Sequence, residues 1–195
     1  RGRDMVAFGR AEAGSYLLFI PKGFTAEGMG IDLTTHALTS EEEAWAWFSA
    51  TYPASAERLL PYRNRGRKRS DKGDYWWELR ACAYYDQFEQ SKIFYQAFQV
   101  MPCFVYDEGS TFCNNSIFFL SVPDKALLAL LCSETGWWLI SEFCPRIQNG
   151  HQLIWDNFSQ IPIPTTLPPE LDVLADELMQ ALADGDTVFL CKDAE

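Results

Sequence analysis

Short aromatic and β-branched runs between Lys92 and Val122 are the feature that most constrains the fold of this chain. The runs are separated by Met101-Pro102 and by Asp107-Glu108-Gly109-Ser110. Runs of this kind, bounded by turn residues, are typical of β-strands, and an acid followed by Gly-Ser suits a hairpin turn. We therefore expect the central strands of an antiparallel sheet in this stretch.

Helical patterns lie on both sides of these strands. Ser40 followed by Glu43 has the spacing of a capping box, which predicts a helix from about Glu41 to Ala50. A second amphipathic helix is expected from Pro53 to Tyr62. Further helices are expected at Ala126–Leu131, at Trp137–Phe143 after Gly136, and from Pro168-Pro169-Glu170 to about Ala183.

The first 24 residues predict two short strands, of which Ser15–Pro21 is the clearest, followed by a loop marked by Gly23, Gly28 and Gly30. Residues 145–150 predict another loop. Together these elements predict an α+β fold with a mixed, mainly antiparallel curved sheet, helices on its faces and a C-terminal helix. We expect one domain over 1–165 and a helical tail over 166–195 that packs on the domain or extends it.

Composition narrows the class of protein. The 195 residues are 48% hydrophobic, enough for one well-buried core, but no apolar run approaches the roughly 20 residues of a membrane span. The six cysteines are scattered without a C-x-x-C pair and there are two histidines, so we expect reduced thiols, no structural zinc and no disulfide. We expect a cytoplasmic protein, and the non-methionine start suggests a piece of a longer chain.

Charge points in two directions. The net charge of −11 argues against general affinity for nucleic acids, because neutralisation of phosphates supplies most non-specific binding. However, seven of the sixteen basic residues fall within fifteen positions: Arg58, Arg63, Arg65, Arg67, Lys68, Arg69 and Lys72. This segment would either bind several phosphates or form a solvated loop after a helix.

The residue inventory does not support catalysis. The chain has no G-x-S-x-G, Walker or H-E-x-x-H motif, and neither histidine has a nearby carboxylate or cysteine that would complete a relay. The acids Glu41-Glu42-Glu43 are better explained as the start of a helix. A methyltransferase would also need a glycine-bearing cofactor turn and an Asn-Pro-Pro-aromatic motif, and both are missing.

Polar side chains suited to recognition remain. Asn114-Asn115-Ser116 precedes the apolar run Ile117–Leu120, where it would either project amides from the mouth of a strand or cap its own turn. Lys92 lies on an aromatic strand and is expected to reach solvent or phosphate. The remaining candidates, in a glycine-containing loop, are Arg146, Gln148 and His151.

Two tryptophan pairs leave a similar choice open. Trp76-Trp77 and Trp137-Trp138 would stack on a splayed base or, as is commoner in a chain with 15% aromatic residues, divide between core and surface.

A series of phrases in one order resembles a known family. The phrases are Trp77-Glu78-Leu79-Arg80, Tyr84-Tyr85-Asp86-Gln87-Phe88-Glu89, Lys92-Ile93-Phe94-Tyr95, Cys103-Phe104-Val105-Tyr106-Asp107 and Asn114-Asn115-Ser116-Ile117-Phe118-Phe119, with Gly2-Arg3-Asp4-Met5 before them and Ile161-Pro162-Ile163-Pro164 after them. In this order they resemble the TaqI-like specificity domain, the target-recognition module of DNA adenine methyltransferases and of fused restriction-modification enzymes.

The resemblance implies a function in recognition. The module would read double-stranded DNA as part of a larger site-specific N6-adenine methyltransferase, in some members with an endonuclease domain. The methyltransferase domain of the same parent chain would bind S-adenosylmethionine, and this piece would hold no cofactor or metal and have no catalytic residue. By the resemblance, DNA contacts would come from Lys92, Asn114, Asn115 and the loop around Arg146. The residue pattern described above adds Arg63, Arg65, Arg67, Lys68, Arg69, Lys72, Ser116, Gln148 and His151. The alternative is an acidic protein-interaction module or a degenerate, non-binding relative.

Overall fold

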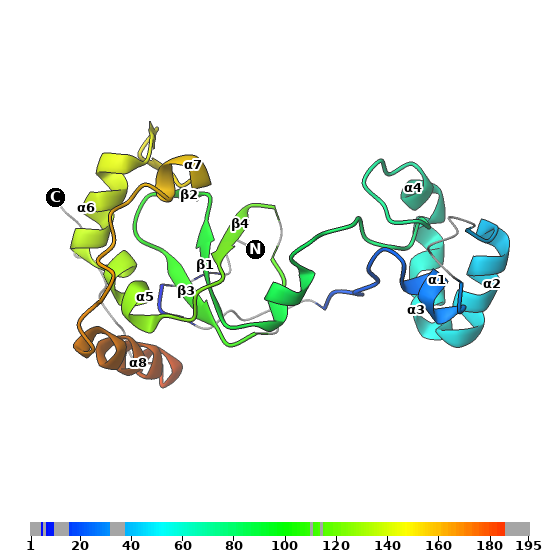
Figure 1. Cartoon of the computed structure of the whole chain (residues 1–195), viewed down its shortest axis with the longest axis horizontal. Coiled ribbons are helices and arrows are strands. Elements are labelled where there is room, and N and C mark those ends of the chain that lie inside the picture. The colour runs from blue at the N-terminus through cyan, green and yellow to red at the C-terminus, as the bar shows by residue number, and fades with distance from the viewer. Residues whose placement is uncertain are drawn as a thin grey trace. The chain divides into compact units, whose positions relative to one another are not determined.

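The computed structural model describes residues 5, 7–9, 16–31, 38–109, 111–113 and 115–185. The chain divides into two compact units (Figure 1). Tyr16–Ala83 form one, which we call the helical unit, and Arg1–Ser15 together with Tyr84–Glu195 form the other, which we call the sheet unit. Each unit has its own core. No helix among the described residues is long and apolar enough to cross a bilayer.

The helical unit contains α1 (Phe24–Gly28), α2 (Glu41–Thr51), α3 (Pro53–Leu59), the 3₁₀ turn η3 (Leu60–Tyr62) and α4 (Arg63–Arg67). The predicted capping box is confirmed, because the amide of Glu43 donates to Ser40 Oγ at 3.3 Å and the hydroxyl of Ser40 donates to the Glu43 carboxylate at 3.0 Å. The predicted helix from Pro53 to Tyr62 is also confirmed as α3 and η3.

Two expectations for the N-terminal region are wrong. The strand expected at Ser15–Pro21 is absent from its described residues, 16–21, and α1 occupies the stretch where a loop is expected. The other strand expected in the first 24 residues lies largely outside the described residues. The apolar run has strand-forming residues, but Tyr16 is fully exposed and Leu17 and Leu18 are 51% and 43% exposed. An apolar run becomes a strand only where another strand pairs with it, and none of the described segments does so here.

Aromatic rings fill the core of the helical unit. Trp45 lies between two neighbours, with ring centroids 4.9 Å from Trp76 and 5.0 Å from Trp77. Phe48 from the next turn of α2 is 1% exposed and also packs against Trp77. The Trp76-Trp77 pair therefore belongs to the core, and the stacking interpretation of this pair is wrong.

The sheet unit confirms the α+β class, although its sheets are small and not clearly curved. Antiparallel strands β1 (Lys92–Gln96), β3 (Phe104–Asp107) and β4 (Ile117–Leu120) pair in the order β3-β1-β4. A second antiparallel sheet joins β2 (Phe98–Gln99), β6 (Gly150–Gln152) and β5 (Arg146–Ile147) in the order β2-β6-β5. The short 3₁₀ helix η4 (Tyr85–Glu89) precedes β1.

Two predictions about the connections between strands are wrong. Residues 107–110 do not form a hairpin turn, because β1 lies between β3 and β4 and the connection must pass over it. Residues 145–150, expected to be a loop, contain β5 and the start of β6, which form a hairpin with Gln148 in the left-handed region at φ 54°.

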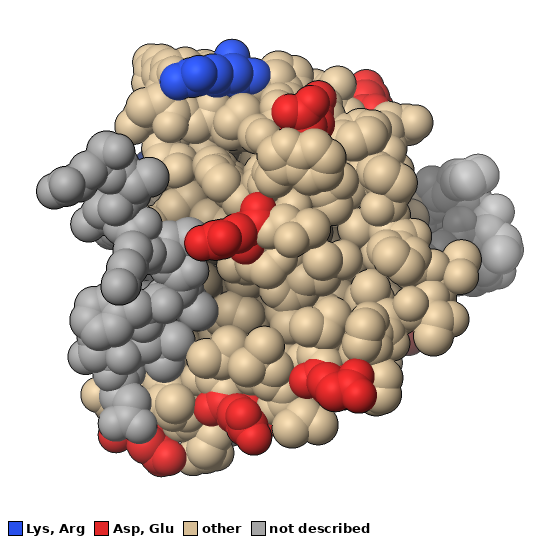
Figure 2. Space-filling view, turned by 90° about the vertical axis from the view of Figure 1, so that its left-hand side faces the viewer, with Lys and Arg blue, Asp and Glu red and all other residues tan. Residues whose placement is uncertain are grey.

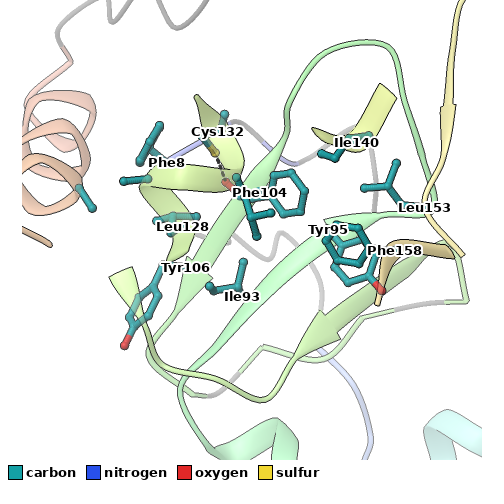
Figure 3. Close-up of a cluster of buried hydrophobic side chains, with 14 of the residues drawn as sticks. Phe8, Ile93, Tyr95, Phe104, Tyr106, Leu128, Cys132, Ile140, Leu153 and Phe158 are labelled. Atoms are coloured by element: carbon teal, nitrogen blue, oxygen red, sulfur yellow. Dashed lines mark hydrogen bonds between the residues drawn. The ribbon is translucent and has the colours of Figure 1, made fainter. Parts of the chain in front are cut away.

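Both faces of the larger sheet are buried. Ile93, Tyr95, Phe104 and Tyr106 point to one face, while Phe94 and Val105 point to the other, as the two-residue period of a strand requires. The first face packs on a cluster that includes Leu128, Ile140 and Phe158 from helices of the same unit and Leu153 from the segment after β6 (Figure 3).

Four helices cover this core: α5 (Lys125–Cys132), α6 (Glu134–Phe143), α7 (Trp155–Phe158) and α8 (Glu170–Ala183), with α8 packed on α5. The predicted helices at 126–131 and 170–183 are confirmed. The helix expected from Trp137 begins earlier, because Ser133 Oγ accepts a hydrogen bond from the amide of Gly136 and caps it. Gly136 thus lies inside α6, where a Cβ would meet Leu130 O at 2.1 Å.

Candidate nucleic-acid interface

The basic segment runs along one side of the helical unit. Through α3, η3 and α4 the inward residues are Ala56, Leu59 and Gly66, and a Cβ at Gly66 would meet the Trp76 ring at 2.6 Å. Glycine at this position therefore allows α4 to lie directly on the aromatic core. The exposed side chains of this stretch include the cations Arg58, Arg65 and Lys68, and also the acid Glu57 and the apolar Leu60.

Ion pairs divide the cations of this segment. Glu41 Oε1 accepts from Arg67 Nε at 2.7 Å and lies 3.5 Å from Arg63 Nη2. The hydrogen bond to Glu41 raises the pKa of Arg67 further above its usual value. Exposed pairs of this kind contribute little to stability, so a phosphate can replace the carboxylate at little cost.

The end of the segment is held by its own backbone. Lys72 Nζ donates to the carbonyl oxygens of Arg69 at 2.9 Å and Arg67 at 3.3 Å, where it caps the last turn of α4. Arg69 Nε lies 3.4 Å from Asp71 Oδ1. Within the part of the chain that the structure describes, Arg58, Arg65 and Lys68 have no ion pair, so these three present unpaired charge.

A buried carboxylate anchors the loop that follows this segment. Glu78 is 0% exposed and has no cation beside it among the described residues. Its oxygens accept hydrogen bonds from the amides of Asp74 at 2.9 Å, Thr25 at 3.0 Å, and Gly23 and Tyr75 at 3.4 Å. Four N–H donors replace the water that an ionised carboxylate would lose on burial.

Lys92 does not reach the surface. It is 0% exposed, and its ammonium donates to Phe88 O at 2.6 Å, Gln90 O at 3.0 Å and Asp107 Oδ2 at 2.6 Å. The expectation that this side chain reaches solvent or phosphate is therefore wrong. The sequence pattern assigns Asp107 to a turn and misses its role as the partner of this lysine.

The polar triplet lies at the start of β4. Asn114 lies outside the described residues, whereas Asn115 and Ser116 are exposed immediately before Ile117. Ser116 O accepts a hydrogen bond from the amide of Ala97 at 3.2 Å, which fixes the backbone at Ser116 against the end of β1. The exposed side chain of Asn115 has the donors and acceptor that adenine recognition uses.

The other three candidates share one hairpin. Arg146 and His151 are directly opposite each other on β5 and β6, and Gln148 is exposed in the turn between them. His151 is half-buried, with Nδ1 3.1 Å from Cys144 O and its ring edge-on to Trp137. Ala97 O also accepts from the amide of Leu153 at 2.8 Å, so this hairpin and the Asn115 turn are attached to the same stretch of chain.

The net charge is distributed unequally between the units. The helical unit has nine acidic and nine basic residues, whereas the sheet unit has eighteen acidic and seven basic residues and thus carries the whole net charge of −11. Of its described cations, Lys92 pairs with Asp107 and Lys125 pairs with Asp176, which leaves Arg146 without an ion pair. Acidic side chains are spread over the face of this unit in Figure 2, where basic atoms lie at the upper edge.

The remaining features to consider are metal ligands, cysteines and the second tryptophan pair. No group of three or more His, Cys, Asp or Glu side chains in the described part of the chain could hold a metal ion. None of the described cysteines, Cys82, Cys103, Cys113, Cys132 and Cys144, is in a disulfide. Trp138 is 59% exposed while its neighbour Trp137 is half-buried, so this second pair divides between surface and interior.

No protein-family model matches the chain, and no curated protein matches it significantly.

Proposed function

We propose that this chain is the DNA-recognition module of a larger site-specific N6-adenine methyltransferase or restriction-modification enzyme. The ordered phrases that resemble the TaqI-like specificity domain support this class. The observation that carries the proposal is the exposure of Arg58, Arg65 and Lys68, which have no ion pair among the described residues and belong to a unit with equal numbers of acidic and basic residues. In this proposal the parent protein works in the cytoplasm, and its methyltransferase domain binds S-adenosylmethionine.

The two units would contribute different contacts. Cations on the helical unit would neutralise phosphates, which supplies affinity but no sequence information. Exposed amide and guanidinium groups on the sheet unit, from Asn115, Gln148 and Arg146, are of the types that read adenine and guanine edges. A net charge of −11 on the sheet unit restricts its contacts to a few positions, because most of its surface repels phosphate.

A salt titration tests the phosphate contacts, with variants in which neutral glutamine replaces a basic residue. We would measure binding of the full chain to a randomised duplex library by fluorescence anisotropy, from about 50 mM to 200 mM KCl. In the variant Arg65→Gln/Lys68→Gln, we expect weaker binding and a salt slope smaller by about 0.9 for each phosphate that is no longer neutralised. Lys22→Gln is the matched control, because Lys22 is an exposed cation of the same unit that pairs with Asp74 at 3.2 Å outside this segment.

Two results would overturn the proposal. One is a weakening by Lys22→Gln at least half as large as that of the double variant, which would mean that only net charge matters, because the control removes one positive charge and the double variant removes two. The other is no binding to any duplex in the library at the lowest salt, both for the chain and for its full-length parent.

A second candidate function is protein interaction. The sheet unit carries all of the net negative charge and exposes Trp138 and Trp155 by 59% and 61%. Large exposed aromatic residues are enriched at protein interfaces. In this case we expect a purified partner to stay bound at about 500 mM KCl, where exposed charges are screened within roughly 4 Å, and after nuclease treatment.

A further inference from the structure

A buried ion pair joins the first residue of β1 to the last residue of β3 in the sheet unit. Lys92 and Asp107 are partners in the register of β1 and β3 and lie on the same face as Phe94 and Val105. Their exposed fractions are 0% and 7%, and Lys92 Nζ lies 2.6 Å from Asp107 Oδ2. The same ammonium holds two carbonyl oxygens of the η4 turn, those of Phe88 and Gln90. All three of its protons are thus used.

The carboxylate of the pair organises the connection between β3 and β4. Asp107 Oδ2 also accepts from the amides of Gly109 at 3.2 Å and Thr111 at 3.4 Å, and Oδ1 accepts from the Thr111 hydroxyl at 2.6 Å. Gly109 has φ 101°, and a Cβ there would meet Glu89 O at 2.3 Å. The start of the connection is therefore packed tightly against the η4 turn that Lys92 holds.

The connection leads directly to the exposed Asn115. At its other end, Cys113 Sγ lies 3.3 Å from Ile117 O, and Ile117 pairs with Gln96 of β1. The described residues of the connection are thus fixed at both ends, by Asp107 on one side and by β4 on the other. Asn115, which the proposed function assigns to base recognition, lies between these two ends.

We propose that Lys92 and Asp107 are positioning residues for this recognition loop. Instead of contacting DNA, Lys92 holds the η4 turn and Asp107 in place, and Asp107 sets the conformation from which Asn115 is presented. A buried ion pair often contributes no more to stability than an apolar pair of the same volume, so the gain lies in conformational specificity. This inference rests on the proposed function for its DNA-reading part.

A charge-free replacement of the pair tests the inference. Lys92→Met/Asp107→Leu removes both charges together and leaves neither one buried without a partner. We expect this variant to fold, but with amide exchange at Gly109 and Thr111 faster by about tenfold or more. Selectivity for the duplexes that the unmodified chain selects from a randomised library should fall by about tenfold, the value of one base contact. Affinity for non-selected duplexes should not change, because the cations of the helical unit are intact.

The matched control is Lys125→Met/Asp176→Leu. Lys125 and Asp176 form the other described ion pair of the sheet unit, between α5 and α8, with side chains 29% and 58% exposed. This control should leave both loop exchange and selectivity unchanged. If Lys92→Met/Asp107→Leu fails to fold, Thr111→Val removes only the hydroxyl bond to Asp107 and should shift both readouts in the same direction by a smaller factor.

The outcomes separate the two proposals. Slow exchange and full selectivity in Lys92→Met/Asp107→Leu would overturn the inference while the proposed function stands. Absence of duplex binding by the unmodified chain and its parent would overturn the proposed function and the reading role together. The exchange rates would still decide whether the pair fixes the loop.

Discussion

At the scale of single residues, two buried carboxylates, those of Glu78 and Asp107, hold loops in place through hydrogen bonds to backbone amides. Glu78 accepts four backbone amides without a cation beside it among the described residues, and it joins the start of α1 to the loop before Trp77. Asp107 combines a cation with loop amides and a hydroxyl. Glu78 lies within the phrase Trp77-Glu78-Leu79-Arg80 and Asp107 ends the phrase that begins at Cys103, so these phrases contain structural anchors as well as core residues.

Glu78 is expected to be sensitive even to an isosteric change. Glu78→Gln replaces one acceptor oxygen by a donor that faces an N–H group, and we expect a loss of about 1–3 kcal/mol in the free energy of unfolding. Glu78→Ala leaves four amides without acceptors and should cost more. Urea unfolding followed by tryptophan fluorescence measures both, because Trp77 is adjacent. Glu57→Gln, an exposed change on α3, is the control, and an equal effect there would contradict the assignment.

Asp107 predicts a dependence of stability on pH. Burial tends to raise its pKa, but the hydrogen bonds from Lys92 and Thr111 and the attraction of the ammonium outweigh this and lower the pKa. A lowered folded-state pKa means that the stabilisation is complete above the unfolded value, about 3.9, and is lost as the pH falls through the folded value. Below about pH 4 the urea midpoint of the unmodified chain should therefore fall relative to that of Lys92→Met/Asp107→Leu, which has no carboxylate at position 107 to protonate. A constant difference between about pH 6 and pH 2 would contradict this.

At the scale of elements, the sequence predicts what local interactions determine. The capping box at Ser40, the leucine-rich run in α5 and the Pro-Pro-Glu start of α8 each fix a helix within a few residues, and all three helices are present. The buried Lys92 and the order β3-β1-β4 depend on contacts between distant segments. For the same reason the run after Ser15 resembles a strand in the sequence, although no described segment pairs with it.

The candidate site divides in the same way. The exposure of Arg65 and Lys68 follows from charge and glycine content, which the sequence displays. The neutralisation of Arg67 by Glu41 links positions 26 residues apart and could not be read from spacing. Pairing of α2 with α4 through Glu41 therefore decides which cations of the segment are unpaired.

The start of α2 is a test at this scale, because the Glu41 ion pairs depend on it. Ser40→Ala removes the side-chain acceptor of the Glu43 amide, and we expect a loss of about 1 kcal/mol. Ser40→Asn, which restores an acceptor without placing another carboxylate beside Glu43, should recover most of it. Thermal unfolding measures both changes. Equal destabilisation by alanine and asparagine would mean that the cap contributes little.

At the scale of the whole molecule, charge separates the two units. Eighteen acidic and seven basic residues in the sheet unit produce repulsion that a folded structure must withstand, whereas nine of each in the helical unit do not. The helical unit is instead stabilised in part by attraction, since Arg67 pairs with Glu41 and Glu42. Salt weakens both effects, because exposed charges are screened beyond roughly 10 Å at 0.1 M.

Added salt should therefore act in opposite directions on the two units. Between about 20 mM and 500 mM KCl, where the screening length shortens severalfold, we expect slower amide exchange in α5, α6 and α8. Exchange in α2 and α4 should stay constant or become faster. Hydrogen exchange resolved by peptide compares both units in one sample of the intact chain. Sulfate is not a suitable salt, because it strengthens apolar burial everywhere.

The same response in both units would show that the uneven division of charge has no energetic effect. A slower exchange limited to the sheet unit would show that its surplus of acids destabilises it at low salt, which is the condition under which a partner of opposite charge would stabilise it most.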